Sequence, residues 1–241
     1  MTLSSSWSRP PLSPALEPVD AAVWRVQAGT IRPIEAVLAR YLGLRPSSVV
    51  LRRSRAGKPE LEGSPFRVSL AHSGDVAVVA VTYGREVGVD VELLRARTES
   101  WALSSHALTH SERARLQALP ASRRSEAFLS MWTRKEALLK AVGVGLALDP
   151  RLIELEDLKI VAAPPELGRA CDWTLVDLPL AGYAAALALK GPLSRLLLYD
   201  VCPASGALEP DPNRAPRPAQ PRPRRGGAGR ARPSGRAGTG A

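Results

Sequence analysis

Residues 128–146 read FLSMWTRKEALLKAVGVGL, and this stretch decides much of what the chain can fold into. Two aromatic and two charged residues recur every four positions: Phe128, Trp132, Glu136 and Lys140. A helix places such residues in one stripe, and we expect it over 124–142, ending at Gly143. The pair Glu136 and Lys140 fits a surface salt bridge. Because a stripe of core-facing aromatics leads into it, a buried charge with a chemical role is the alternative.

The stretch Gly88-Val89-Asp90-Val91-Glu92 lies upstream and predicts a strand over 87–93. Side chains alternate along a strand, so the valines share one face and the two carboxylates share the other. Asp90 and Glu92 then repel each other. A solvated strand face is one interpretation, and coordination of a hard divalent cation by both carboxylates is the other.

Two shorter motifs carry hydrogen-bond donors. Arg55-Ala56-Gly57-Lys58-Pro59 reads as a turn, and Ala71-His72-Ser73-Gly74 follows a predicted strand. Each is ordinary alone, as a turn and as a structural histidine. Together, Arg55, Lys58 and His72 would form a cluster suited to phosphates, which basic side chains bind through charge-assisted hydrogen bonds.

The rest of the chain mixes both periodicities. A further helix is expected at 31–42 and another at 111–119, and further strands at 19–26, 49–53, 66–71, 76–83, 173–178, 183–190 and 195–201. This pattern predicts an α+β protein with two comparable halves, over 19–98 and 99–202.

Both ends differ from this pattern. Residues 1–18 are rich in Ser and Pro, so we expect a flexible segment there. Residues 203–241 hold eight Arg against Glu209 and Asp211, together with eight Pro and seven Gly. Such a composition predicts a disordered tail, which also carries more than half of the formal net charge of +10.

Composition and the apolar pattern exclude several classes of protein. A hydrophobic fraction of 45% allows a real core, and no apolar run is long enough for a membrane span. Cys171 and Cys202 make neither a disulfide framework nor a metal quartet. The N-terminus lacks the pattern of a secretory signal, so we expect a cytoplasmic protein.

Residues 57–146 contain four motifs in a fixed order: GKP, HSG, GVDVE and FxxxWTxKEAxxKAxGxGL. In this order the chain resembles the 4′-phosphopantetheinyl transferase superfamily, in its long, two-halved (surfactin-synthetase-activating) type. The resemblance implies two α+β halves related by a pseudo-twofold axis, with the site between them, in a monomer. It also implies transfer of phosphopantetheine from coenzyme A to a serine of an acyl or peptidyl carrier protein, with release of adenosine 3′,5′-bisphosphate. Neither a membrane nor a nucleic acid is an expected partner.

The resemblance also assigns roles. It implies Mg²⁺ ligands at Asp90, Glu92 and Glu136, with Glu136, Lys140 and Asp90 as the catalytic set. It implies that coenzyme A contacts Lys58, His72, Lys135 and Lys140, with Arg55 nearby, and that Trp132 packs beside the site. Three carboxylates around one hard cation, with lysines for phosphates, suit phosphoryl-type transfer.

Two departures from the family pattern stand out. Ala71 replaces the usual serine before the histidine, and the chain after Val26 lacks roughly one helix-turn unit of an Arg-rich segment, judged by ordinary connection lengths. Arg25 and Arg32 are the nearest substitutes. The alternatives are therefore a non-catalytic member that binds coenzyme A or a carrier protein, or a nucleic-acid-binding protein acting through its Arg-rich tail.

Overall fold

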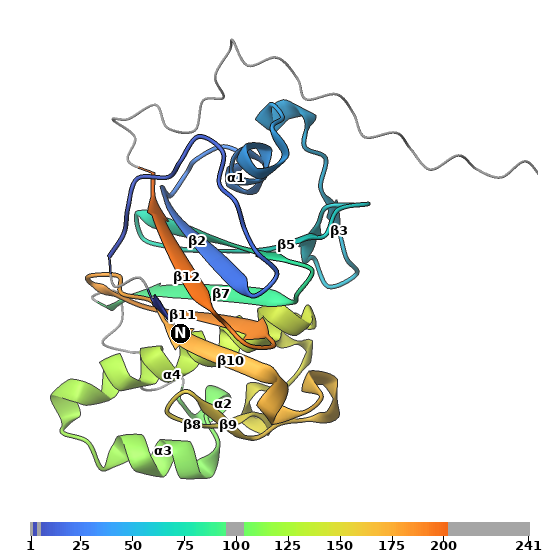
Figure 1. Ribbon diagram of the computed structural model, residues 1–241. Coiled ribbons are helices and arrows are strands. Elements are labelled where there is room, and N and C mark those ends of the chain that lie inside the picture. The colour runs from blue at the N-terminus through green and yellow to red at the C-terminus, as the bar shows by residue number, and fades with distance from the viewer. Residues whose placement is uncertain (1, 4–5, 95–103, 202–241) are drawn as a thin grey trace, which may run out of the picture.

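The computed structural model describes residues 2–3, 6–94 and 104–201, which contain two main sheets and one small one (Figure 1). The larger sheet has the order β1-β12-β2-β6-β5-β4-β3. Its strands are β1 (Thr2–Leu3), β12 (Arg195–Asp200), β2 (Asp20–Gln27), β6 (Val76–Tyr83), β5 (Phe66–Ser73), β4 (Pro59–Glu60) and β3 (Arg52–Arg53). The second sheet has the order β10-β11-β7, with β10 at Trp173–Asp177, β11 at Tyr183–Lys190 and β7 at Val87–Leu93. A hairpin joins β8 (Glu154–Glu156) to β9 (Lys159–Ala162).

The helices lie outside the two stacked sheets. They are α1 (Pro33–Leu42), α2 (Ser104–Ala107), α3 (His110–Gln117) and α4 (Ala121–Val142), with short 3₁₀ turns between them. Figure 1 shows α1 on the outer side of the larger sheet and α4 on the outer side of the smaller one. The α+β fold class expected from the sequence is confirmed.

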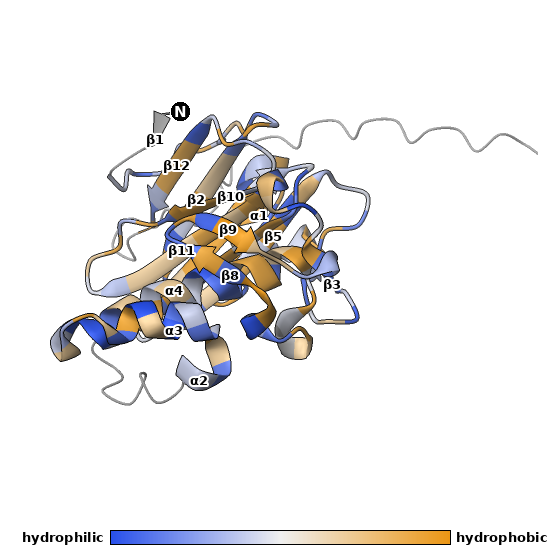
Figure 2. Ribbon diagram, turned by 90° about the horizontal axis from the view of Figure 1, so that it is seen from below, coloured by the Kyte–Doolittle hydropathy of each residue, from blue (hydrophilic) through white to orange (hydrophobic). Residues whose placement is uncertain are grey.

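Each layer boundary has its own apolar core. Trp24 and Val37 belong to the core between α1 and the larger sheet. The valines of β7 belong to the core between the two sheets, and Phe128 and Leu138 to the core below the smaller sheet. Figure 2 shows the same division, with hydrophobic strands at the centre and a mostly hydrophilic α3 outside.

The two halves of the chain exchange strands. β7 follows β6 in the chain but pairs with β11, and β12 follows β11 but pairs with β2. Each sheet therefore contains strands from both sides of residues 98 and 99. The halves 19–98 and 99–202 with their pseudo-twofold stay a prediction, because their boundary lies outside the described residues.

Several element bounds differ from those expected. β5 continues through His72 and Ser73, so both lie within a strand rather than after it. The strand expected at 49–53 is reduced to β3, because Pro46–Ser48 form a 3₁₀ turn. Helix α1 begins at Pro33 because Arg32 adopts the left-handed conformation, with φ of 52°.

The N-terminal segment is docked where the structure describes it. Ser8 forms a bridge with Tyr199 of β12. The indole Nε1 of Trp7 donates to the carbonyl of Pro179 at 2.7 Å, and Arg25 lies over the Trp7 ring at 5.4 Å. The flexibility expected for residues 1–18 stays a prediction, and part of that range lies outside the described residues. The tail expected at 203–241 lies outside the described residues.

Candidate functional site

The site is built where α4 crosses β7. Gly88 makes this approach possible, because a Cβ at that position would lie 1.9 Å from the carbonyl oxygen of Ala137 and 2.4 Å from the backbone nitrogen of Ala141. No side chain fits there. The helix backbone therefore lies directly on the strand, two residues before Asp90.

Asp90 and Lys140 meet across this contact. Lys140 Nζ donates to Asp90 Oδ1 at 2.6 Å, and Asp90 is 6% exposed. Asp90 Oδ2 and Glu136 Oε1 are both buried, and neither has a hydrogen-bond partner among the described residues. Buried polar atoms normally have partners, so two unpartnered carboxylate oxygens from adjacent elements indicate a binding function.

The pKa values of Asp90 and Glu136 are both raised above their ordinary values. Burial raises the pKa of Asp90 to about 6, against the opposing effect of Lys140. Burial, followed by the charge of Asp90, raises the pKa of Glu136 to about 7. The charge of Glu92 adds to both pKa values. The site thus concentrates negative charge where water solvates it poorly.

These residues fit a hard cation by their chemistry, since carboxylate oxygens are the ligands that Mg²⁺ prefers. The two unpartnered oxygens of Asp90 and Glu136 are available as ligands. Within the described ranges, however, no three His, Cys, Asp or Glu side chains form a ready-made metal cage. A cation would therefore require small side-chain movements.

Glu92 lies at the end of β7 and is half-buried. Its Oε2 accepts a hydrogen bond from Ser73 Oγ at 3.1 Å. On α4, Trp132 is half-buried and stacks on Phe128, with 6.5 Å between ring centroids. The stripe expected on this helix is thus present, with the aromatic pair toward its start and the charged pair toward its end.

Lys58 lies at the C-terminal end of α4. Its Nζ donates to Glu86 Oε2 at 2.6 Å and to the carbonyl of Ala141, the residue after Lys140. Gly143 allows this approach, because a Cβ there would lie 3.2 Å from Lys58 Cδ. The lysine of the GKP motif therefore reaches the helix that carries Glu136 and Lys140.

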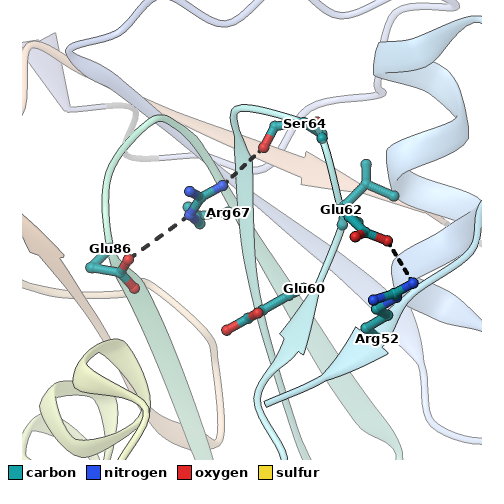
Figure 3. A pocket seen from close by; sticks show the side chains of 8 residues that line it. Arg52, Glu60, Glu62, Ser64, Arg67 and Glu86 are labelled. Atoms are coloured by element: carbon teal, nitrogen blue, oxygen red, sulfur yellow. Dashed lines mark hydrogen bonds and ion pairs between the residues drawn. The ribbon is translucent and has the colours of Figure 1, made fainter. Parts of the chain in front are cut away.

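A pocket of about 570 Å³ opens beside Glu86 (Figure 3). Four of its charged lining residues pair with one another, Arg52 with Glu62 at 2.9 Å and Arg67 with Glu86 at 3.9 Å, and the remaining one, Glu60, is acidic. Because three carboxylates stand against two guanidinium groups, the pocket gives no independent indication of an anionic ligand.

The phosphate cluster expected from the sequence is only partly assembled. Arg55 is exposed in the turn between β3 and β4. His72 is exposed on β5, and alternation turns it away from the face of Ala71 and Ser73. Among the described residues, no hydrogen bond joins Arg55, Lys58 and His72 to one another. Their roles toward coenzyme A stay a proposal.

Lys135 lies elsewhere, which corrects the role expected for it. Its side chain is 0% exposed, and its Nζ donates to Glu112 Oε2 and to the carbonyls of Ala107 and Pro150. All three donors are used inside the protein. Lys135 therefore has a structural position, which does not fit contact with coenzyme A.

Three functional candidates escaped the sequence analysis: Ser73, Glu86 and Gly88. Gly88 stands inside a motif that was already singled out, and a glycine in a strand interior signals close backbone approach. Ser73 also stands in a quoted motif, but neither Ser73 nor Glu86 gave a signal of its own, because their partners come from other elements.

Comparison with known proteins places these residues in a family. The sequence model described as the 4′-phosphopantetheinyl transferase superfamily matches residues 86–188, from the start of β7 into β11. The 4′-phosphopantetheinyl transferase HetI of Nostoc sp. is 35% identical over 167 residues, which are 66% of this chain and 68% of HetI. The chain belongs to the 4′-phosphopantetheinyl transferase superfamily. Its enzyme class is that of these transferases, as expected from the sequence.

Other members of the superfamily are similar over shorter stretches. The L-aminoadipate-semialdehyde dehydrogenase-phosphopantetheinyl transferase of Eremothecium gossypii is 36% identical over 57% of this chain and 54% of its own length. A holo-(acyl-carrier-protein) synthase from Bacillus anthracis, solved in complex with CoA (3′,5′-ADP), is 21% identical, with a TM-score of 0.37, over 44% of this chain and 96% of that one. In the described part of the chain, no helix is long and apolar enough to cross a membrane.

Proposed function

We propose that this superfamily member transfers the 4′-phosphopantetheine group of coenzyme A to a serine of an acyl or peptidyl carrier protein, with Mg²⁺ held by Asp90, Glu92 and Glu136. The observation that carries the proposal is the pair of buried, unpartnered carboxylate oxygens on Asp90 and Glu136 beside Lys140. The superfamily match spans all of these residues.

In the proposed reaction, a bond forms between the carrier serine Oγ and the phosphorus next to pantetheine. The bond from that phosphorus to the bridging oxygen of the diphosphate breaks, and adenosine 3′,5′-bisphosphate leaves with the electron pair. The serine proton passes to Glu136, which acts as the general base.

The chain's cations position the nucleotide. Lys140 is 31% exposed on its open side, so it can shift from Asp90 toward the diphosphate and stabilise charge on the leaving group. Lys58 reaches the end of α4 through the Ala141 carbonyl, and it would contact the nucleotide by leaving its partner Glu86. Bound Mg²⁺ would supply further neutralisation of the diphosphate. Because β7 and α4 come from one chain, we propose that a monomer suffices.

The test is to incubate the protein with coenzyme A, Mg²⁺ and an apo carrier protein, and to follow the carrier by mass spectrometry. We expect the mass of one phosphopantetheine to be added, and the addition to stop when a chelator removes Mg²⁺. Binding of coenzyme A without any mass change would instead favour the non-catalytic alternative.

A further inference from the structure

Among the described strands, one edge of β7 has no partner in its sheet, because β7 follows β11 as the last strand. Two serine side chains of β5, a strand of the other sheet, cover this edge. Ser69 Oγ accepts from the backbone nitrogen of Val89 at 3.1 Å, and Ser73 Oγ accepts from that of Leu93 at 3.0 Å. These hydroxyls hold β7 against the larger sheet without a backbone ladder.

Ser73 makes a second contact that Ser69 lacks. Because its oxygen accepts from the Leu93 amide, its own proton is free to point elsewhere, and it donates to Glu92 Oε2 at 3.1 Å. One hydroxyl thus binds the backbone of one residue and the carboxylate of the residue before it. Hydrogen bonds to a charged group are stronger than neutral ones.

The turn after Ser73 is packed so that this contact is held. Gly74 has φ of 55°, a conformation that favours glycine, and a Cβ there would lie 3.2 Å from Leu93 Cδ2 and 3.4 Å from the Tyr183 hydroxyl. The end of β5 therefore rests directly on the end of β7. A long, flexible glutamate side chain is fixed at its backbone and at its carboxylate.

We infer that Ser73 is a positioning residue that holds the Glu92 carboxylate ready for the cation, an inference that rests on the proposed function. Glu92 and Asp90 share one face of β7, but Glu92 is half-buried and lies near the strand end, where its side chain has more freedom. Without the Ser73 hydroxyl, binding of the cation would have to fix the Glu92 side chain, and the lost side-chain entropy would oppose binding. Cation affinity then falls, while the base and the lysine on α4 are unchanged.

The experiment measures binding of Mn²⁺ alone, by electron paramagnetic resonance, to wild type, Ser73→Ala, Ser73→Thr and Ser69→Ala. We expect Ser73→Ala to weaken Mn²⁺ binding about tenfold, in keeping with loss of one charged hydrogen bond. Ser73→Thr keeps the hydroxyl and should stay within about twofold of wild type. Ser69→Ala is the matched control, because it removes an acceptor from the same strand edge but touches no carboxylate.

Kinetics give a second readout. In Ser73→Ala, the Mg²⁺ concentration for half-maximal transfer should rise about as much as the Mn²⁺ dissociation constant, with turnover at saturating Mg²⁺ close to wild type. In a Glu92→Gln background, Ser73→Ala should have no further effect on Mn²⁺ binding. Thermal melting of every variant checks the fold.

Three results would overturn the inference: equal Mn²⁺ affinity in Ser73→Ala and wild type, an equal loss in Ser69→Ala, or no Mn²⁺ binding by wild type. The first two leave the proposed transfer intact. If Mn²⁺ binding depends on Ser73 but no phosphopantetheine is transferred, the inference stands and the proposed function fails.

Discussion

Lys140 Nζ lies 2.6 Å from Asp90 Oδ1, while the other carboxylate oxygen of Asp90 is buried without a partner among the described residues. One side of the aspartate is thus neutralised from α4, and the other side is available to a ligand. The two residues stand 50 positions apart in the chain and meet because Gly88 admits the helix backbone.

Asp90→Asn should abolish transfer and leave the fold intact. The change keeps the size of the side chain but removes the charge that a cation needs, in a position where burial already disfavours that charge. Mass spectrometry of the carrier measures transfer, and circular dichroism checks the fold. Near-normal transfer at ordinary Mg²⁺ concentrations would remove Asp90 from the metal site.

Glu136→Gln and Lys140→Ala should fail in different ways. Glu136→Gln keeps hydrogen bonding but loses basicity, so it should chiefly lower turnover and weaken the dependence on Mg²⁺. Lys140→Ala should weaken coenzyme A binding and lower turnover together, because the same ammonium serves bound substrate and leaving group. Steady-state kinetics separate the two patterns.

The control for this pair is Arg151→Ala, which breaks the exposed ion pair of Arg151 with Asp149. A surface pair contributes no more than about 1 kcal/mol, and transfer should be unchanged. If Glu136→Gln and Lys140→Ala behave like this control, the proposed site is wrong.

The stability of the metal-free protein should fall as the pH rises from about 4 to 7. The ordinary pKa of Glu is about 4.3 in the unfolded chain. In the folded protein the pKa of Glu136 is raised to about 7. The pKa of Asp90 is likewise raised above the ordinary value for Asp, to about 6. Between these values the folded state binds more protons than the unfolded state, so the stability that these two carboxyl groups contribute is present near pH 4 and is lost as the pH rises.

Glu136→Gln removes the destabilising effect of an ionised Glu136. In chelator, its melting temperature should match wild type near pH 4.5 and exceed it at pH 8, where ionised Glu136 costs on the order of 1–2 kcal/mol after allowance for its partial exposure. Thermal melts across this pH range decide the point. A wild type that gains stability over the variant as pH rises would contradict the raised pKa.

Gly88→Ala should disrupt the site through packing. The added methyl meets the α4 backbone, which must move away, at a cost of about 1–3 kcal/mol or more. Transfer should fall beyond the loss of stability, because the shift separates Asp90 from Lys140. Gly84→Ala is the control, since its neighbourhood is open within 4 Å and its cost is conformational, from φ of 69°. Equal transfer by both variants would contradict the close approach.

Local patterns predicted the two elements that matter most. Alternation indicated β7 with its true bounds, and the step of four indicated the helix α4 and its stripe. What periodicity could not predict was contact between elements. The Ser73 contact with Glu92 depends on strand exchange between two sheets, and the Lys58 contact depends on where α4 ends.

Lys135 is a second residue whose contacts the sequence pattern could not predict. It stands beside Glu136 in a motif, so a shared role was a natural expectation. One step along a helix turns a side chain by about 100°, and this turn points Lys135 into the core rather than toward β7. Its partner Glu112 closes a capping box with Thr109, a local signal that gives no hint of a lysine 23 residues later.

Lys135→Met should destabilise the fold by about 3–5 kcal/mol, because it leaves the Glu112 charge buried without its cation. Glu112 still accepts from the backbone nitrogens of Thr109 and Leu155, so the loss should stay short of complete unfolding at low temperature. Lys140→Met, on the same helix but partly exposed, should lose less stability, because Asp90 with its raised pKa can take up a proton when its partner is gone, and it should lose transfer.

Urea unfolding and carrier transfer, both at 10 °C, separate the two lysines. We expect transfer per folded molecule to be near wild type in Lys135→Met and absent in Lys140→Met. The double variant Lys135→Met with Glu112→Gln should recover part of the lost stability, since no unpaired charge remains buried. A stable Lys135→Met protein with weakened coenzyme A binding would instead return Lys135 to the nucleotide site.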